Sequence, residues 1–226
     1  FGYAWQRIRD RYAQLGGVVN GDSLDATQFD GGGAFVSYEL NSLNKKMYAD
    51  AGAQLEVTLR FNDGLEAYTP HNEDGPTFQA RHSWFQAKVG YVKITRLSRR
   101  LAVGFSLNGA YSSLDPYSNP VATRLSSPRF NPFQDSPVLY VAPLYSKAYV
   151  APGLRVLFNL TDKVQWRMEG HYFQSFFAPE NAGAQKFNFD PLNKLMLVGS
   201  GVLYNTPVGP IGVWVNYYDT GKNPFR

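Results

Sequence analysis

The feature that most constrains the fold of this chain is a strict alternation of apolar and polar residues over residues 52–61. There Leu55, Val57, Leu59 and Phe61 alternate with Glu, Thr and Arg. A β-strand points successive side chains to opposite faces, so a period of two gives it one apolar and one polar face. The stretch therefore predicts a β-strand with apolar surroundings on one face and polar surroundings on the other.

Further stretches repeat this pattern, some less cleanly, and each is long enough for a strand of about eight to twelve residues. They are residues 34–41, 84–93, 101–111, 148–159, 164–173, 195–205 and 211–218. Gly and Pro supply 21 and 14 residues, spread along the chain, and this favours many turns over a helical bundle. The sequence thus predicts an all-β chain of antiparallel strands.

The connections between these stretches alternate in length along the chain. Residues 44–50, 95–100, 160–163 and 206–210 are short connections, whereas residues 62–83, 112–147 and 174–194 are long ones. Transmembrane barrels have short periplasmic turns and longer extracellular loops, and about ten tilted residues cross their apolar band. A soluble sandwich has no reason to gather every long loop at one end. The pattern therefore favours an antiparallel transmembrane β-barrel segment over a soluble β fold.

The alternation assigns each strand side chain either to lipid or to the interior of such a barrel. The residues expected to face lipid are Leu55, Val57, Leu59, Phe105, Leu107, Trp166, Met168, Val213 and Val215. The charged and titratable residues expected to form a network in the lumen are Glu56, Arg60, Lys88, Arg155, Arg167, Glu169 and His171. Their mixed signs indicate a filled or wetted interior and not a selective pore.

Residues 1–15 show a different spacing. Apolar residues from Phe1 to Leu15 recur at helical intervals with Arg and Asp between them, and two glycines follow as a stop signal. This predicts a short amphipathic N-terminal helix, either packed on neighbouring elements or lying on a membrane surface, and we favour the packed helix. The expected organisation is a helix and loop over residues 1–32 and a barrel segment over residues 33–226.

Charge and composition limit the kinds of binding partner and site that the chain can have. With 22 Lys and Arg against 18 Asp and Glu, the formal charge of +4 is too small and too scattered to indicate nucleic acid binding. The lack of Cys excludes disulfides and thiolate metal sites. No apolar run is long enough for a membrane-spanning helix. The chain starts at Phe1 without an initiator Met, so we expect a mature or excised segment.

Motifs for catalysis and metal binding are scarce. The Gly-x-Ser-x-Gly elbow of serine hydrolases does not occur. Asp30-Gly31-Gly32 looks like the Asp-Gly-Gly of a patatin active site, but without that elbow it is interpreted as a glycine-rich turn before the next strand. His71 and His82 fall in one long connection with no carboxylate pattern for a metal site. We therefore expect no catalytic residue, metal or cofactor in this segment.

One pair of residues leaves a catalytic alternative open. His171 and Ser175 share a face of their strand, so a hydrolase embedded in the barrel could use them as base and nucleophile. The commoner arrangement places His171 in the lumen network with Arg167 and Glu169, and we favour it. A non-catalytic barrel subunit of an outer-membrane complex is a third hypothesis.

Three segments point to a family when they are taken together. They are ELNSLNKKMY (39–48) before Gly52, YSNP (117–120) with ATRLSSPRF (122–130), and LYNTPVGP (203–210) leading to VNYYD (215–219). The first is generic, and the other two are specific. Over about residues 33–225 the chain resembles the C-terminal barrel of the patatin-like phospholipase outer-membrane proteins of Bacteroidota, a branch of the BamA-like (Omp85) superfamily.

The resemblance implies a bacterial outer-membrane location and a larger barrel of roughly sixteen strands, within the range of such barrels. It also implies a membrane anchor or translocation unit for a periplasmic or surface lipase domain outside this chain. The partners would be outer-membrane lipid and other outer-membrane proteins in a complex.

Three departures from the family pattern stand out. Ala49-Asp50-Ala51 stands where Pro-Thr-Lys is usual, the family's Arg-Gly-Phe loop motif is absent, and a final strand would follow residues 223–225. The segment is thus expected to be an open arc whose edge strands, at Ala34 and Tyr218, pair with strands outside it.

Overall fold

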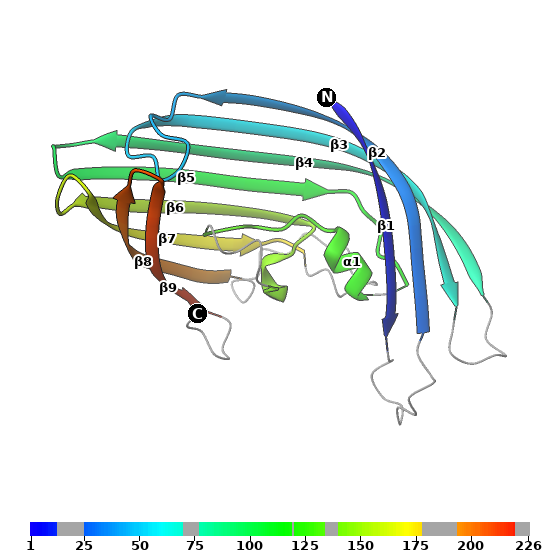
Figure 1. The fold of residues 1–226 in the computed structure, drawn as a ribbon. Coiled ribbons are helices and arrows are strands. Elements are labelled where there is room, and N and C mark those ends of the chain that lie inside the picture. Colours follow the sequence, from blue (N-terminus) through cyan, green and yellow to red (C-terminus); the bar gives the residue numbers. More distant parts are fainter. Residues whose placement is uncertain (13–24, 70–76, 119, 134–139, 178–193, 220–226) are drawn as a thin grey trace.

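The computed structural model describes residues 1–12, 25–69, 77–118, 120–133, 140–177 and 194–219. They form one nine-stranded antiparallel sheet in which each strand pairs with its neighbours in sequence (Figure 1). The strands are β1 (Gly2–Tyr12), β2 (Asp25–Asn41), β3 (Gly52–Thr69), β4 (Phe78–Arg96), β5 (Leu101–Ser112), β6 (Ala148–Asn159), β7 (Val164–Ser175), β8 (Lys194–Thr206) and β9 (Gly209–Tyr218). A short helix, α1 (Pro120–Ser126), and one 3-10 turn, η2 (Ala142–Leu144), lie between β5 and β6. The all-β antiparallel prediction is confirmed.

None of the helices in the described residues has the length and hydropathy needed to cross a membrane.

Every stretch predicted as a strand is a strand, and several strands are longer than predicted. β3 ends at Thr69 and β4 begins at Phe78, so the long connection predicted over residues 62–83 is mostly strand, and His82 lies in β4. The extensions keep the two-residue period but contain Asn, Asp, Gly and His, residues that are typical of turns. Short and long connections alternate from β4 onward, but the β3–β4 connection is now shorter than the β2–β3 connection, so the predicted alternation holds only for that part of the chain.

The predicted N-terminal helix is wrong, because residues 2–12 form β1 and pair with β2 along their whole length. The glycine-rich stretch predicted as a turn lies inside β2, which crosses the domain boundary expected at residue 32. Of these glycines, Gly32 makes room for β1, since a Cβ there would lie 1.9 Å from Tyr3 Oη, whereas Gly31 and Gly33 lie close to β3. Cross-strand contacts therefore override the helical spacing of the sequence.

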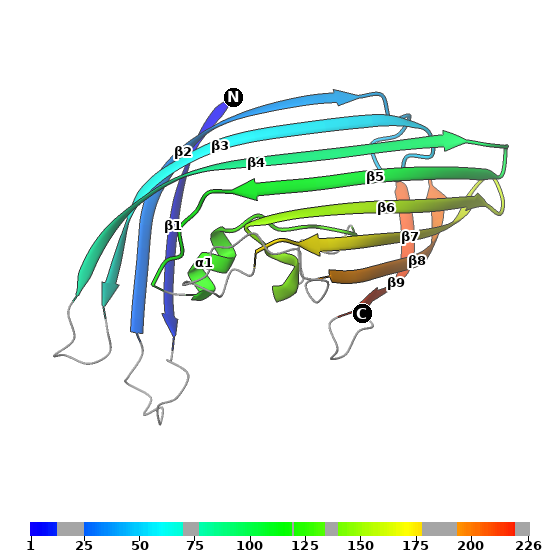
Figure 2. The same ribbon diagram turned by 180° about the vertical axis from the view of Figure 1, so that it is seen from behind.

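The sheet is an open arc in the part of the chain that the structure describes. Its strand order runs from β1 to β9 without joining the two ends, and Figures 1 and 2 show the two edges apart. The predicted edge at Ala34 is wrong, because β1 already pairs with that strand. The edges are β1 and β9, and the last residues of the chain, 220–226, lie outside the described residues.

The two faces of the arc differ in polarity. On β7, Trp166 and Met168 are exposed on the convex face. The residues that alternate with them, Arg167, Glu169 and His171, are buried on the concave face. The strict alternation places each class of side chain on one side because the strand period is two.

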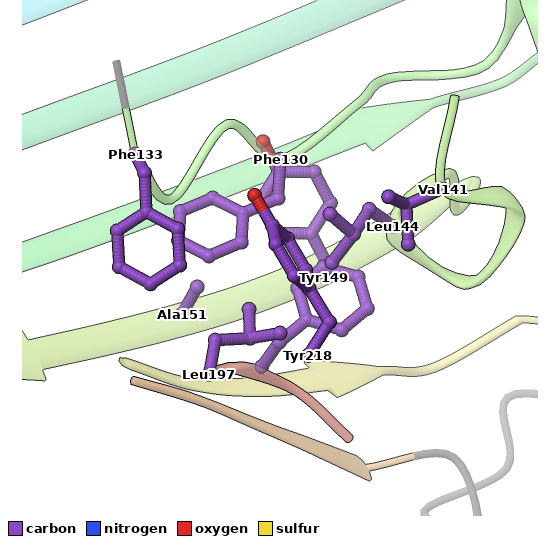
Figure 3. Close-up of a cluster of buried hydrophobic side chains, with 9 residues drawn as sticks. Phe130, Phe133, Val141, Leu144, Tyr149, Ala151, Leu197 and Tyr218 are labelled. Carbon is purple, nitrogen blue, oxygen red and sulfur yellow. The ribbon is translucent and has the colours of Figure 1, made fainter. Parts of the chain in front are cut away.

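The long connection between β5 and β6 folds back onto the concave face, and we call its described residues between 113 and 147 the inward loop. Its side chains form a core with strands β6 to β9 (Figure 3); the buried members are Phe130, Phe133, Val141, Leu144, Tyr149, Ala151, Phe173, Leu197 and Tyr218. A second cluster joins Leu114, Tyr117 and Ala122 of this loop to Phe29 and Trp84. The inward loop therefore fills part of the concave side.

The connection between β2 and β3, residues 42–51, also folds inward, at the end of the arc where the connections are short. We call it the latch. Its Ala49 packs against Ile94, Ala102 and Leu157 on the concave face. Gly52, with a φ of +106°, turns the chain back into β3, and a Cβ there would lie 2.2 Å from the Ser42 carbonyl oxygen. Only glycine fits this return.

Cross-linking distinguishes the observed β1 strand from a helix. Tyr3 lies directly opposite Ala34, and Arg7 lies opposite Asp30. Opposed Cα atoms in antiparallel strands are about 4.5–5.5 Å apart, which suits a disulfide. The chain has no Cys, so introduced thiols have no competitors. We expect Tyr3→Cys/Ala34→Cys and Arg7→Cys/Asp30→Cys both to oxidise fully, as measured by intact mass spectrometry.

The control is Tyr3→Cys/Asp30→Cys, which joins residues about 13 Å apart along the strands. It should stay reduced. A helix rises only about 1.5 Å per residue and could not satisfy both positive pairs. Efficient oxidation of the control, or of only one positive pair, would contradict the β1 register.

Candidate functional site

The densest group of charges lies on the concave face of β6 and β7. Arg155 and Glu169 are directly opposite one another, and Arg155 Nε lies 3.1 Å from Glu169 Oε2. Arg167 Nε and His171 Nε2 lie 3.8 and 3.9 Å from the same carboxylate. Pairing of opposite charges offsets the cost of burying them. We call these four residues the charge cluster.

Small residues on neighbouring strands leave the space that the charge cluster occupies. A Cβ at Gly153 would lie 2.3 Å from His171 Nδ1 and 2.6 Å from Ser106 Oγ. Phe130 and Phe133 of the inward loop enclose the imidazole with ring centroids 5.5 and 5.7 Å away. Neither ring nitrogen of His171 has a hydrogen-bond partner among the described residues. The inward loop and the charge cluster are therefore packed as one unit.

The latch reaches the charge cluster through Tyr48 and Ala49. Both terminal nitrogens of Arg167 donate to the Ala49 carbonyl oxygen, each at 3.3 Å. The Arg167 guanidinium also lies 5.4 Å from the centroid of the Tyr48 ring, which stacks on Trp214 at 6.1 Å. Tyr48 has a φ of 51°, a left-handed conformation that is uncommon for a residue other than glycine. Contacts with β7 and β9 therefore hold a strained backbone in place.

Asp50 ties the latch to β4. It accepts hydrogen bonds from Asn44, from Lys45 Nζ at 3.1 Å and from Arg96 at 2.7 Å. Burial acts to raise the pKa of the Asp50 carboxyl, but the hydrogen bonds from Asn44, Lys45 and Arg96 outweigh it, so the pKa lies below its ordinary value. Asp50 is therefore ionised at neutral pH and holds two cations.

The other predicted lumen residues form a separate group. Glu56, Arg60 and Lys88 line a cleft of about 460 Å³ farther along the concave face, with Arg129 of the inward loop. Arg60 lies 5.6 Å from the centroid of the Phe35 ring. The structure thus divides the predicted lumen network into two groups, and the charge cluster is the more deeply buried one.

The residues predicted to face lipid all lie on the convex face. Leu59, Phe105, Leu107, Trp166, Met168, Val213 and Val215 are exposed there, whereas Leu55 and Val57 are half-buried. The register aligns such residues across strands, as in the row Leu101, Phe158, Trp166, Val202 and Val213. The convex face therefore carries a broad apolar surface that crosses the strands, and its contact with lipid stays a prediction.

The geometry does not favour a dyad of His171 and Ser175. Ser175 Oγ lies 2.7 Å from Ser146 Oγ and donates to the Phe177 carbonyl oxygen at 3.2 Å. Four residues along a strand separate the two Cα atoms by about 13 Å. Asp30 of the patatin-like motif faces the convex side and accepts hydrogen bonds from Arg7 and Gln28.

The structure also reveals a buried pair that sequence reasoning missed. His82 Nε2 lies 2.8 Å from Glu66 Oε2, and Glu66 Oε1 accepts a hydrogen bond from the backbone N–H of Ser118 at 2.9 Å. The Tyr117 ring meets His82 edge-on at 4.7 Å. The pair anchors the inward loop to the long ends of β3 and β4. The sequence contained a signal for this pair, because the two-residue alternation of the strands continues through Glu66 and His82. His71 lies outside the described residues.

A scan against protein-family models finds no match to this chain, and a search of curated proteins finds no significantly similar sequence.

Gly153 is expected to be intolerant of even a small side chain. Gly153→Ala would force His171 and Ser106 to move, and we expect a loss of about 1–3 kcal/mol in the free energy of unfolding. Gly170→Ala is the matched control, because a Cβ there meets nothing within 4 Å. It should be neutral or stabilising by up to about 1 kcal/mol. Urea unfolding measures both, and equal effects would argue against the packing of His171.

The latch should make stability depend on pH through Asp50. At pH 7, Asp50→Asn should cost about 1–3 kcal/mol, because Arg96 and Lys45 lose a charged acceptor. A carboxyl with a lowered pKa in the folded state stabilises fully above its unfolded pKa of about 3.9. That stabilisation disappears as the pH falls through the lower, folded value. The difference between wild type and variant should therefore be constant from pH 7 to about pH 5 and shrink below about pH 4.

Asp162→Asn is the control for this measurement, since Asp162 is exposed in the short connection between β6 and β7. It should differ little from wild type at any of these pH values. A gap for Asp50→Asn that persists unchanged at pH 3 would contradict the assigned role of the carboxylate.

Proposed function

We propose that this chain is a segment of an outer-membrane β-barrel that serves as a membrane anchor or translocation unit. The observation that carries the proposal is the apolar convex face. Exposed apolar patches on soluble monomers rarely exceed a few hundred Å². Here exposed Leu, Val, Phe, Tyr, Trp, Ile or Met side chains occur on that face in each of the nine strands. Lipid would remove this surface from water.

The height of this surface fits a bilayer. On β5 the outer positions from Leu101 to Tyr111 carry no charged side chain. At about 3.4 Å per residue and a tilt of about 45°, this length spans about 25 Å along the barrel axis, the height of the apolar band of outer-membrane barrels. The dimension supports strands that cross a membrane once each.

Most charges on the convex face gather toward the end with the long connections; the exception is Lys93, exposed opposite Phe105. Past the aromatic Phe61 on β3, this face carries ion pairs between Arg7 and Asp30 and between Arg81 and Asp63, the second at 2.7 Å. Barrels have aromatic girdles where the apolar band meets water. This boundary supports an orientation with the long connections outside the cell and the short connections in the periplasm.

The free edges of the arc support a larger assembly. An unpaired backbone N–H or C=O group in hydrocarbon costs several kcal/mol, so β1 and β9 both need partners in a membrane. Further strands of the same protein would complete a barrel of roughly sixteen, as the sequence resemblance implies. A non-catalytic subunit in an outer-membrane complex is the second candidate function, and the same open edges favour it.

The filled interior supports an anchor over an open pore. The inward loop and the latch both occupy the concave side, and the charge cluster lies between them. Translocation through this segment would require one of them to move. The attached lipase domain and the relation to the Bacteroidota patatin-like proteins depend on the sequence resemblance alone, and a Gly-x-Ser-x-Gly elbow in an adjoining domain would support them.

Two bulk measurements test the membrane proposal. The intact protein should need detergent for solubility, give a β-rich circular dichroism spectrum and migrate faster on gels when it is unheated. Full solubility without detergent, or a helical spectrum, would rule out the membrane barrel.

A charge on the convex face should be far more costly than a charge on the concave face. Val57→Arg should lower the free energy of unfolding in bilayers by about 2–4 kcal/mol. Gln54→Arg, on the concave face of the same strand, is the control: Gln54 donates to Glu39 at 2.8 Å, so a cation there gains a partner. We expect its effect to be below about 1 kcal/mol. A larger loss for Gln54→Arg would invert the assigned faces.

A further inference from the structure

A chamber lies between the latch and the charge cluster. Its volume is about 310 Å³, at the lower end of the range for small-molecule sites. Tyr48 of the latch lines one side, Arg155 and Arg167 line the sheet side, Trp214 comes from β9, and Phe133 belongs to the inward loop. All of these walls are residues of this chain. The chamber therefore needs no contribution from the further strands that would complete the arc into a barrel.

Positive charge is in excess in this chamber. Lys45, Lys46, Arg155 and Arg167 line it, and Glu169 is the one carboxylate among its lining residues. Glu169 already contacts Arg155 at 3.1 Å and has Arg167 at 3.8 Å. Lys45 is already paired with Asp50 of the latch at 3.1 Å. Asp50 and Glu169 together cannot neutralise these four cations and Arg96, which also contacts Asp50, so the chamber keeps an excess of positive charge that attracts an anion.

Two buried N–H groups in the chamber wall also lack an acceptor. Arg167 Nε and Trp214 Nε1 have no hydrogen-bond partner among the described residues. Buried polar groups in native proteins are nearly all paired, so each orphan indicates water, an ion or a ligand. Both groups are donors, and the partner that satisfies them must be an acceptor. Excess positive charge favours an anionic one.

Part of the lining is apolar, beside the amide side chains of Gln54 and Asn131. Val92 and Ile94 of β4, with Phe133 of the inward loop, face the same space as the cations. We infer that the chamber binds an amphipathic anion: a phosphate monoester or a carboxylate that carries a short alkyl chain. Arg155 and Lys46 contact the charged group, and the apolar part of the wall contacts the chain. This inference goes beyond the anchoring role and does not require an attached lipase.

Calorimetry with defined probes tests the site. The intact protein in phosphatidylcholine nanodiscs is titrated with decyl phosphate below its micellar concentration, with inorganic phosphate and with decyl maltoside. We expect saturable binding of decyl phosphate, about tenfold or more tighter than inorganic phosphate because the alkyl chain adds apolar burial, and no saturable binding of decyl maltoside. Inorganic phosphate binding as tightly as decyl phosphate, or decyl maltoside binding equally, would overturn the proposal.

Variants locate the binding. Lys46→Glu changes an exposed latch residue, so it should fold normally and weaken decyl phosphate binding by about tenfold, through reversal of one charge. Arg155→Gln should weaken it at least as much. Arg60→Gln removes a cation from the other cleft and should leave affinity within about twofold of wild type. The site would be refuted if Lys46→Glu bound decyl phosphate as tightly as wild type. It would also be refuted if Arg60→Gln lost as much affinity as Lys46→Glu, because binding would then lie elsewhere.

Discussion

One continuous cross-strand register keeps the apolar and polar faces of this sheet apart, and the remaining features depend on it. Trp166 lies opposite Phe158 and Val202, while its neighbour Arg167 lies opposite Leu157 and Gly201 on the other face. A slip of one residue would move the whole set to the wrong face. In the proposed membrane, each charge turned toward lipid would cost about 2–4 kcal/mol, so many side chains together fix the register. The same register places Glu169 opposite Arg155 and gives His171 the space above Gly153.

Most of the sheet could be predicted from sequence because apolar side chains recur at every second position in its strands. The errors fall where a local signal competes with a tertiary one. In and next to β1, Phe1, Trp5 and Ile8 also fit a helical spacing, but pairing with β2 along the whole strand, with room for Tyr3 at Gly32, favours the extended chain. In β3 and β4, turn-forming residues hide the strand extensions, since Asp63 and Ser83 resemble a loop until they are paired.

The interior was predictable only in part. Alternation assigned Arg155, Arg167, Glu169 and His171 to the concave face, but pattern alone could not say which charges meet, because that depends on register between strands. The latch and the inward loop escaped prediction for another reason. Their contacts, such as Arg167 with Ala49, join residues distant in sequence, and no periodicity in a connection indicates that it folds back onto a sheet.

The central claim is that the convex face meets lipid and the concave face does not. Trp166 and Trp214 test it directly, because they lie in adjacent cross-strand rows at nearly equal depth but on opposite faces. The chain has four Trp residues, so variants that retain only Trp166 or only Trp214 are made by Trp→Phe replacement. In vesicles of brominated lipid, the fluorescence of Trp166 should be strongly quenched and that of Trp214 should be nearly unchanged. Equal quenching, or stronger quenching of Trp214, would contradict the account.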